Sequence, residues 1–174
     1  MIPCTEFILA YSELFKFLHE RHGRGAVVRF WEELSDEYLK NLRDLARTRG
    51  LQGLRIYWTH TLEEEGAEYD MYMTPDTFTI EMHRCPSVAK LRRARHITPY
   101  RHYCDHCDVL YARVINDYGM CYRLEKIDER EGVCRLTVVK KPGAGKKGEA
   151  TARTSKRRRG DAPAGGAVRK RSAR

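Results

Sequence analysis

The spacing of apolar residues first changes along this chain at Gly66, and this change constrains the fold more than any other feature. Before Gly66, apolar residues recur every three or four positions, which predicts helices. After it, Tyr69, Met71 and Met73 alternate with polar residues, which is the two-residue period of a strand. A chain with these two patterns in succession is expected to combine helices and strands in one α+β fold.

Four helical segments are expected in the first half of the chain. Ser35, followed by Asp36 and Glu37, combines a capping hydroxyl with an acidic first turn, and this pattern predicts a helix start. Gly50 and Gly66 are expected to end helices. The expected segments cover residues 5–23, 26–34, 35–50 and 51–65.

The second half is expected to form two β-hairpins separated by helices. The turn Thr74-Pro75-Asp76 would join the first pair of strands, and Pro86 suits the first position of a short helix. A longer helix is expected over 100–118, followed by strands over 120–127 and 133–139. The predicted fold is α+β: a four-stranded antiparallel sheet from two hairpins, covered by helices, with an N-terminal helical segment.

Positive charge is concentrated at the C-terminal end of the chain. Residues 140–174 contain 13 Lys and Arg against Glu149 and Asp161 alone, whereas residues 1–139 contain 20 basic and 22 acidic residues. The net charge of +9 therefore excludes a basic surface spread over the whole domain. We predict one α+β domain over 1–140 and a disordered basic tail over 141–174, because a segment of Gly, Ala, Lys and Arg buries too little apolar area to fold.

The composition also argues against membrane and secreted classes. The chain has no apolar run of the roughly 18 residues that span a bilayer, and its first residues lack a basic leader. These features predict a soluble protein of the reducing cytoplasm. There the six cysteines would be buried side chains, metal ligands or reactive thiols rather than disulfides.

Side chains able to carry chemistry are densest between His96 and Tyr111. This stretch contains three His, two Cys and two Asp. The helix expected there places Cys104, Cys107 and Asp108 on one face, because they are separated by three and four positions. Cysteine chemistry is therefore the first functional hypothesis.

A metal centre is one form of that hypothesis. A closed zinc site takes four ligands, and a single Cys-x-x-Cys supplies two. The remaining ligands would come from distant parts of the chain, with His83 as a weaker candidate, and the bound metal would be zinc or iron. The expected ligands are Cys85, Cys104, Cys107 and Cys134.

A thiol nucleophile is the competing form. A helix N-terminus or a neighbouring cation lowers the pKa of a thiol, and Cys85 follows Arg84 and precedes Pro86 at an expected helix start. Histidine would serve as the base, with His106 also available for proton transfer. The candidate catalytic residues are Cys85, Cys107, Asp108 and His83.

Packing alone is a third interpretation. Cys134 lies on the apolar face of an expected strand, where a free cysteine behaves as a small hydrophobic side chain. Asp108 would need a partner if buried, and an ion pair with Arg92 or Arg95 would provide one.

Several of these residues together resemble a known family. Cys85-Pro86, the helical Cys104-x-x-Cys107-Asp108, and Gly132 followed by Cys134 in the last strand resemble the L-2-amino-thiazoline-4-carboxylic acid hydrolase-like family over residues 31–139. The resemblance implies a small cytoplasmic α+β protein that opens a cyclic thiazoline at a C–N bond. The sequence departs from the family pattern after Cys134, where Arg135 and Leu136 replace the usual Asp-Phe.

The leading hypothesis is therefore a small cytoplasmic hydrolase-like protein with a cysteine-lined site for a small molecule. The alternative is a metal- or ligand-binding module without turnover, with weak nucleic-acid association through the tail. The tail residues expected to contact phosphate are Lys156, Arg157, Arg158 and Arg159.

Overall fold

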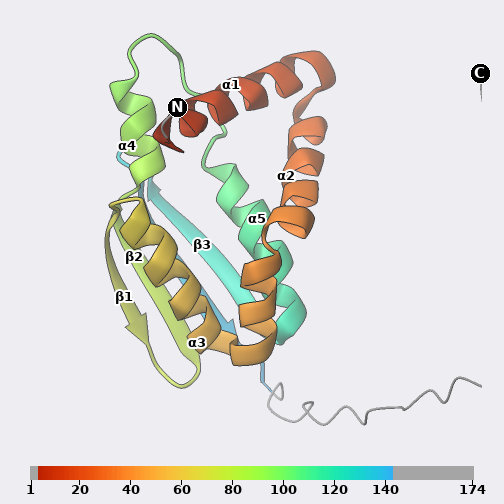
Figure 1. Cartoon of the computed structure of the whole chain (residues 1–174), viewed down its shortest axis with the longest axis vertical. Coiled ribbons are helices and arrows are strands. Elements are labelled where there is room, and N and C mark those ends of the chain that lie inside the picture. The colour runs from red at the N-terminus through yellow and green to blue at the C-terminus, as the bar shows by residue number, and fades with distance from the viewer. Residues whose placement is uncertain (1–3, 143–174) are drawn as a thin grey trace, which may run out of the picture.

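The computed structural model describes residues 4–142 and has an α+β architecture (Figure 1). The four strands form one antiparallel sheet in the order β1-β2-β4-β3. The predicted fold class is confirmed. The elements are α1 (Cys4–His22), α2 (Arg24–Tyr38), α3 (Lys40–Glu64), β1 (Glu68–Met73), β2 (Thr77–Arg84), α4 (Pro86–Arg93), α5 (Asp105–Ile115), a short 3-10 helix η1 (Asn116–Tyr118), β3 (Met120–Asp128) and β4 (Val133–Lys140).

Both hairpins close through side-chain contacts to the backbone of their turns. The hydroxyl of Thr74 accepts a hydrogen bond from the backbone N–H of Thr77 at 3.0 Å. In the second hairpin, the carboxylate of Asp128 accepts from the N–H groups of Arg130 and Glu131 at 2.9 and 3.1 Å. Because β2 pairs with β4, the two hairpins join along their second strands into one sheet.

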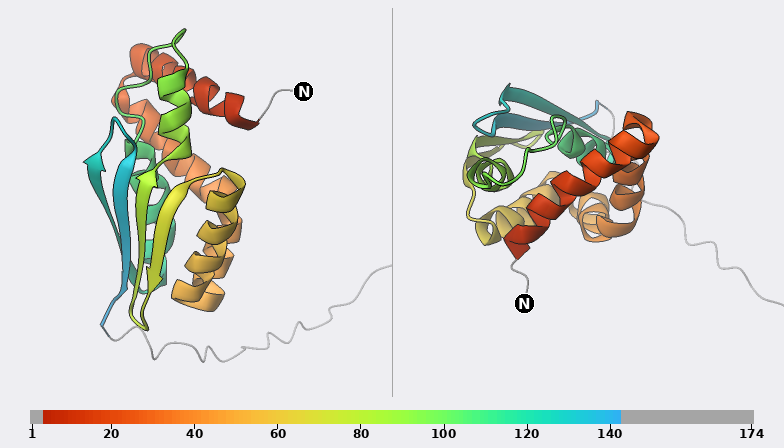
Figure 2. Two further views of the ribbon diagram at one scale, coloured as in Figure 1. Left: turned by 90° about the vertical axis from the view of Figure 1, so that its left-hand side faces the viewer. Right: turned by 90° about the horizontal axis from the view of Figure 1, so that it is seen from above.

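Helices cover one face of this sheet, as both views in Figure 2 show. α3 and α5 pack on that face over a core of apolar side chains, in which the rings of Trp58 and Phe78 stack at 5.7 Å. The alternation of β2 places Phe78 and Ile80 in this core and leaves Glu81 and His83 on the opposite face. The cavity described below lies on the covered face.

A second core lies where α1, α2 and α4 meet the segment 94–104. Its centre is the ring of Phe15, which meets Trp31 edge-on at 5.3 Å. The buried hydroxyl of Ser12 accepts a hydrogen bond from the backbone N–H of Tyr100 at 2.8 Å and ties the 94–104 segment to α1.

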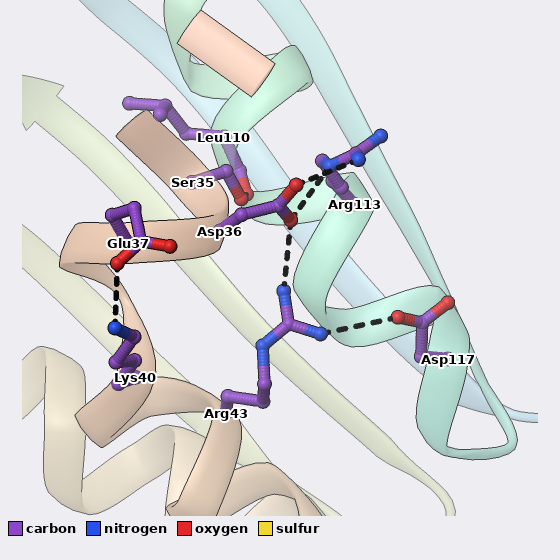
Figure 3. A network of polar contacts seen from close by, with 8 residues as sticks. All are labelled: Ser35, Asp36, Glu37, Lys40, Arg43, Leu110, Arg113 and Asp117. Atoms are coloured by element: carbon purple, nitrogen blue, oxygen red, sulfur yellow. Dashed lines mark hydrogen bonds and ion pairs between the residues drawn. The ribbon is translucent and has the colours of Figure 1, made fainter. Parts of the chain in front are cut away.

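The predicted helix start at Ser35 is wrong. α2 continues through this position to Tyr38, and the following helix begins at Lys40. The Ser35 hydroxyl is fully buried and donates to the carbonyl of Leu110 on α5 at 2.8 Å. Figure 3 shows Ser35 beside Leu110. The neighbouring Asp36 accepts from Arg113 at 2.8 Å. Residues that suggested a cap therefore join two helices.

The long helix expected from residue 100 begins later, at Asp105. Residues 101–104 form turns, and Tyr100 is held against α1 through its backbone N–H. This tertiary contact outweighs the helical start signal of Thr98-Pro99. The break expected near Gly50 is confirmed as a kink within α3, with φ 52° and ψ −132° at that residue.

Within residues 4–142, no helix has the length and apolar character needed to span a bilayer. The tail residues predicted to contact nucleic acid, 156–159, lie outside the described residues.

Candidate functional site

A cavity of about 170 Å³ lies between the sheet and the helices that cover it. Three cysteines from three different elements line it: Cys85 at the start of α4, Cys107 on α5 and Cys134 on β4. His106 and Glu65 line it as well. The remaining lining includes aromatic and aliphatic side chains, among them Trp58, Leu62, Ile80, Met82, Tyr111, Tyr122 and Leu136.

Cys85 is positioned by the β3–β4 loop. Its backbone N–H donates to the carbonyl of Gly132 at 3.0 Å. Gly132 has φ 73°, and a Cβ there would lie only 2.8 Å from the Cβ of Cys85 and 2.9 Å from that of Val88. Only glycine satisfies both the backbone conformation and this close approach. The loop glycine therefore holds the start of α4 against the sheet.

His106 and Cys107 are in contact at the cavity wall. The sulfur of Cys107 lies 3.6 Å from Nε2 of His106. The other ring nitrogen, Nδ1, is in hydrogen-bond contact with the backbone carbonyl of Tyr103. A carbonyl oxygen only accepts, so Nδ1 carries the proton and Nε2 presents a lone pair to the thiol. The pair thus has the arrangement of a nucleophile, a base and a group that orients the base.

Burial keeps the thiols and the imidazole of this cavity neutral. Desolvation raises the pKa of the Cys85 thiol to about 11 and those of Cys107 and Cys134 to about 12. The pKa of His106 is lowered, first by desolvation. At neutral pH the resting site therefore holds protonated thiols and an uncharged imidazole, so Cys85 and Cys107 are not preformed thiolates.

Glu65 follows the last residue of α3 and lines the cavity, and the residue as a whole is exposed. Desolvation raises the pKa of its carboxyl group, and neighbouring Glu64 raises it further. Glu65 is near enough to influence the pKa values of both His106 and Cys107.

Cys104 does not line this cavity. It lines a wider groove of about 590 Å³ formed by α4, the 94–104 segment and the β3–β4 loop. Desolvation raises the pKa of its thiol to about 12. The expectation that Cys85, Cys104 and Cys107 share one cavity is therefore wrong for Cys104.

The cysteines predicted as metal ligands do not all line one cavity, since Cys104 lies outside the lining. Residues 4–142 contain no group of three or more His, Cys, Asp or Glu side chains arranged to hold a metal ion. The zinc or iron centre expected of Cys85, Cys104, Cys107 and Cys134 therefore has no support among the described residues. Cysteines 85, 104, 107, 121 and 134 are free of disulfides.

His83 and Asp108 lie outside the cavity lining. Nε2 of His83 lies 2.9 Å from a carboxylate oxygen of Asp70 on the open face of the sheet, so it cannot transfer protons within the cavity. Desolvation raises the pKa of Asp108, and the charge of Lys126 partly offsets this. Neither Arg92 nor Arg95 pairs with Asp108; Arg92 contacts Glu131 instead.

Two features of the site were not assigned from sequence. The sequence predicts His106 only as a second candidate for proton transfer beside His83, because the continuous helix expected from residue 100 would direct it away from Cys104. Glu65 has the sequence appearance of a solvated helix end in an acidic run. No local pattern indicates that its carboxyl group reaches a cavity wall.

The chain matches no known family model, no curated protein and no solved structure. Fold and site define an α+β protein with a cysteine-lined cavity on the covered face of its sheet.

Proposed function

We propose that this chain is a small cytoplasmic hydrolase in which Cys107 is the nucleophile and His106 the base, acting on a cyclic amidine of the thiazoline type. The observation that carries the proposal is the 3.6 Å contact between the Cys107 sulfur and Nε2 of His106, with the imidazole oriented by the carbonyl of Tyr103. The cysteines free of disulfides fit a reducing compartment.

The electrostatics favour proton transfer during attack rather than before it. The thiol of Cys107 is protonated at neutral pH, and His106 is uncharged. The imidazole is therefore ready to accept the thiol proton as the sulfur approaches an electrophilic carbon. A thiolate formed only at that moment does not need to be stabilised in the resting cavity.

The proposed reaction has two stages. The Cys107 sulfur bonds to the carbon of the protonated amidine while its proton moves to Nε2 of His106, and the C–N double bond becomes single in a tetrahedral adduct. His106 then returns that proton to the ring nitrogen, which leaves as a free amine when the ring C–N bond breaks. In the second stage His106 removes a proton from water, the resulting hydroxide attacks the same carbon, and the C–S bond to Cys107 breaks while the proton on His106 returns to the sulfur. The carbon keeps the oxygen as a carbonyl, and the hydroxyl proton is released to water. The net change is hydrolysis of one ring C–N bond.

The size of the cavity supports a small substrate. Its volume of about 170 Å³ is below the roughly 300–1,000 Å³ of pockets for drug-sized ligands. A single five-membered ring suits this space, whereas a nucleotide or a peptide does not. The thiazoline class comes from the resemblance of Cys85-Pro86, Cys107-Asp108 and Cys134 to the hydrolase-like family.

Ring opening can be followed by proton NMR with 2-amino-2-thiazoline and its 4-carboxylate as substrates. We expect turnover of at least one of them, and Cys107→Ser and His106→Gln should each lower it by about 10²-fold or more, since general-base catalysis contributes about 10²–10⁴-fold. Cys134→Ser is the matched control, because it removes another cavity sulfur outside the Cys107–His106 contact.

Turnover should also fall at acid pH. Protonated His106 cannot accept the thiol proton, and its pKa is lowered from 6.5, so activity should persist at pH 6.5 and decline only below it. Absence of turnover with both compounds, or full activity in Cys107→Ser, would contradict the proposal. Binding without ring opening would favour a ligand-binding module instead.

A further inference from the structure

The charge distribution around the cavity is one-sided. Among residues 4–142, no Lys or Arg lines the cavity, and Glu65 is its only carboxylate. The thiols of Cys85, Cys107 and Cys134 and the phenols of Tyr111 and Tyr122 have raised pKa values, so they are neutral. His106 is neutral as well. Glu65 is therefore the one lining group among the described residues that can carry negative charge in this site.

Lys126, the lysine whose charge affects groups in the cavity, is paired with carboxylates outside it. Lys126 influences the pKa values of Cys107 and His106, but it lies outside the lining and contacts Asp105, with Glu129 at 3.9 Å. Arg92, on the neighbouring groove, contacts Glu131. Among the described residues, an anionic group inside the cavity would therefore meet Glu65 and no lining cation.

We infer that the cavity takes cyclic amidines that carry no carboxylate, and that Glu65 is the residue that binds their N–H groups. This inference rests on the proposed hydrolase function and specifies its substrate class. An amidine presents two N–H groups on either side of one carbon, and a carboxylate accepts two such hydrogen bonds side by side. The carbon between them is the atom that Cys107 would attack.

The same arrangement disfavours a ligand carboxylate. Moving such a group from water into this cavity would remove its hydration without an opposite charge to replace it. It would also place two negative charges in a space of about 170 Å³. A protonated amidine has the opposite effect, since its positive charge pairs with the ionised form of Glu65 and opposes the desolvation that raises the pKa of that carboxyl group.

Titration calorimetry on Cys107→Ser, which blocks turnover, separates binding from chemistry. With 2-amino-2-thiazoline and its 4-carboxylate as the two probes, we expect the uncarboxylated compound to bind at least tenfold more tightly. Adding Glu65→Gln should weaken its binding at least tenfold and reduce the difference between the probes. Glu63→Gln, an exposed residue of the same acidic run that does not line the cavity, is the matched control and should leave both affinities unchanged.

Equal or tighter binding of the carboxylate, or unchanged affinity in Glu65→Gln, would overturn this inference. The comparison of the two probes needs no variant at Glu65, so it stands even if that substitution disturbs folding. Ring opening of the carboxylate by the native chain at the higher rate would contradict the inference and leave the hydrolase proposal intact. The expected selectivity without ring opening of either probe would support the charge selection and contradict the hydrolase.

Discussion

The surroundings of single side chains in this protein depend on tertiary contacts that the local sequence does not indicate. Cys104 and Cys107 lie three positions apart, yet they line different spaces, because α5 begins at Asp105 and the preceding turns follow the 94–104 segment. The resemblance motif contains the three cysteines that line the cavity, Cys85, Cys107 and Cys134. It cannot distinguish Cys104 from them, since the difference depends on how Tyr100 is tied to α1.

Gly132 is the residue at which this packing can be tested directly. Replacement by Ala combines a positive φ with a Cβ that would overlap those of Cys85 and Val88. We expect Gly132→Ala to lower the free energy of unfolding by more than about 1 kcal/mol, measured by urea denaturation. Gly25→Ala lies in the helical α2, where the nearest atom to a new Cβ is a flexible Arg29 nitrogen at 3.5 Å. This control should be neutral or stabilising, and equal losses in both variants would refute the packing argument.

At the scale of elements, the sequence predicts the positions of the strands more accurately than the boundaries of the helices. Alternation of apolar residues located both hairpins, because each strand has one face on the core and one face open. The helix boundary at Ser35 was misplaced because a serine followed by acidic residues has the same sequence whether it caps a helix or bridges to another. Only the position of α5 identifies the bridge.

The two kinds of contact between α2 and α5 should differ in strength. Ser35→Ala removes a fully buried hydrogen bond to Leu110, and we expect a loss of about 1 kcal/mol in the free energy of unfolding. Asp36→Asn weakens exposed ion pairs to Arg113 and Arg43, and it should have a smaller effect that high salt diminishes further. Urea titrations at two salt concentrations measure both. A larger, salt-insensitive effect at Asp36 would show that the ion pairs, rather than the hydroxyl, join these helices.

At the scale of the whole molecule, His106 connects the two cores. Its Nε2 faces the cavity sulfur, while its ring lies 6.3 Å from Phe15 and 4.8 Å from Tyr103, both of the second core. No single segment of sequence indicates this connection, because Phe15 precedes the histidine by most of the folded chain. The orientation of the base therefore depends on helices that do not line the cavity.

Phe15→Leu tests this dependence. Phe15 is 3% exposed, and the substitution removes aromatic contacts at the centre of the second core. We expect the free energy of unfolding to fall by about 1–3 kcal/mol. Turnover should fall several-fold in protein that remains folded. Phe17→Leu, on the same helix but 53% exposed, is the matched control and should retain both stability and turnover. Measurements well below the unfolding temperature separate the two effects. Unchanged turnover in folded Phe15→Leu would mean that the second core does not orient the base.

The protonated state of the cavity sulfurs has a consequence for oxidative damage. Peroxides attack the thiolate form of cysteine, and desolvation makes that form scarce at Cys107 and Cys134. A site that generates its nucleophile only when a ligand is present exposes little of it to hydrogen peroxide between turnovers. The same burial that makes these thiols poor acids should thus protect them from conversion to sulfenic acid.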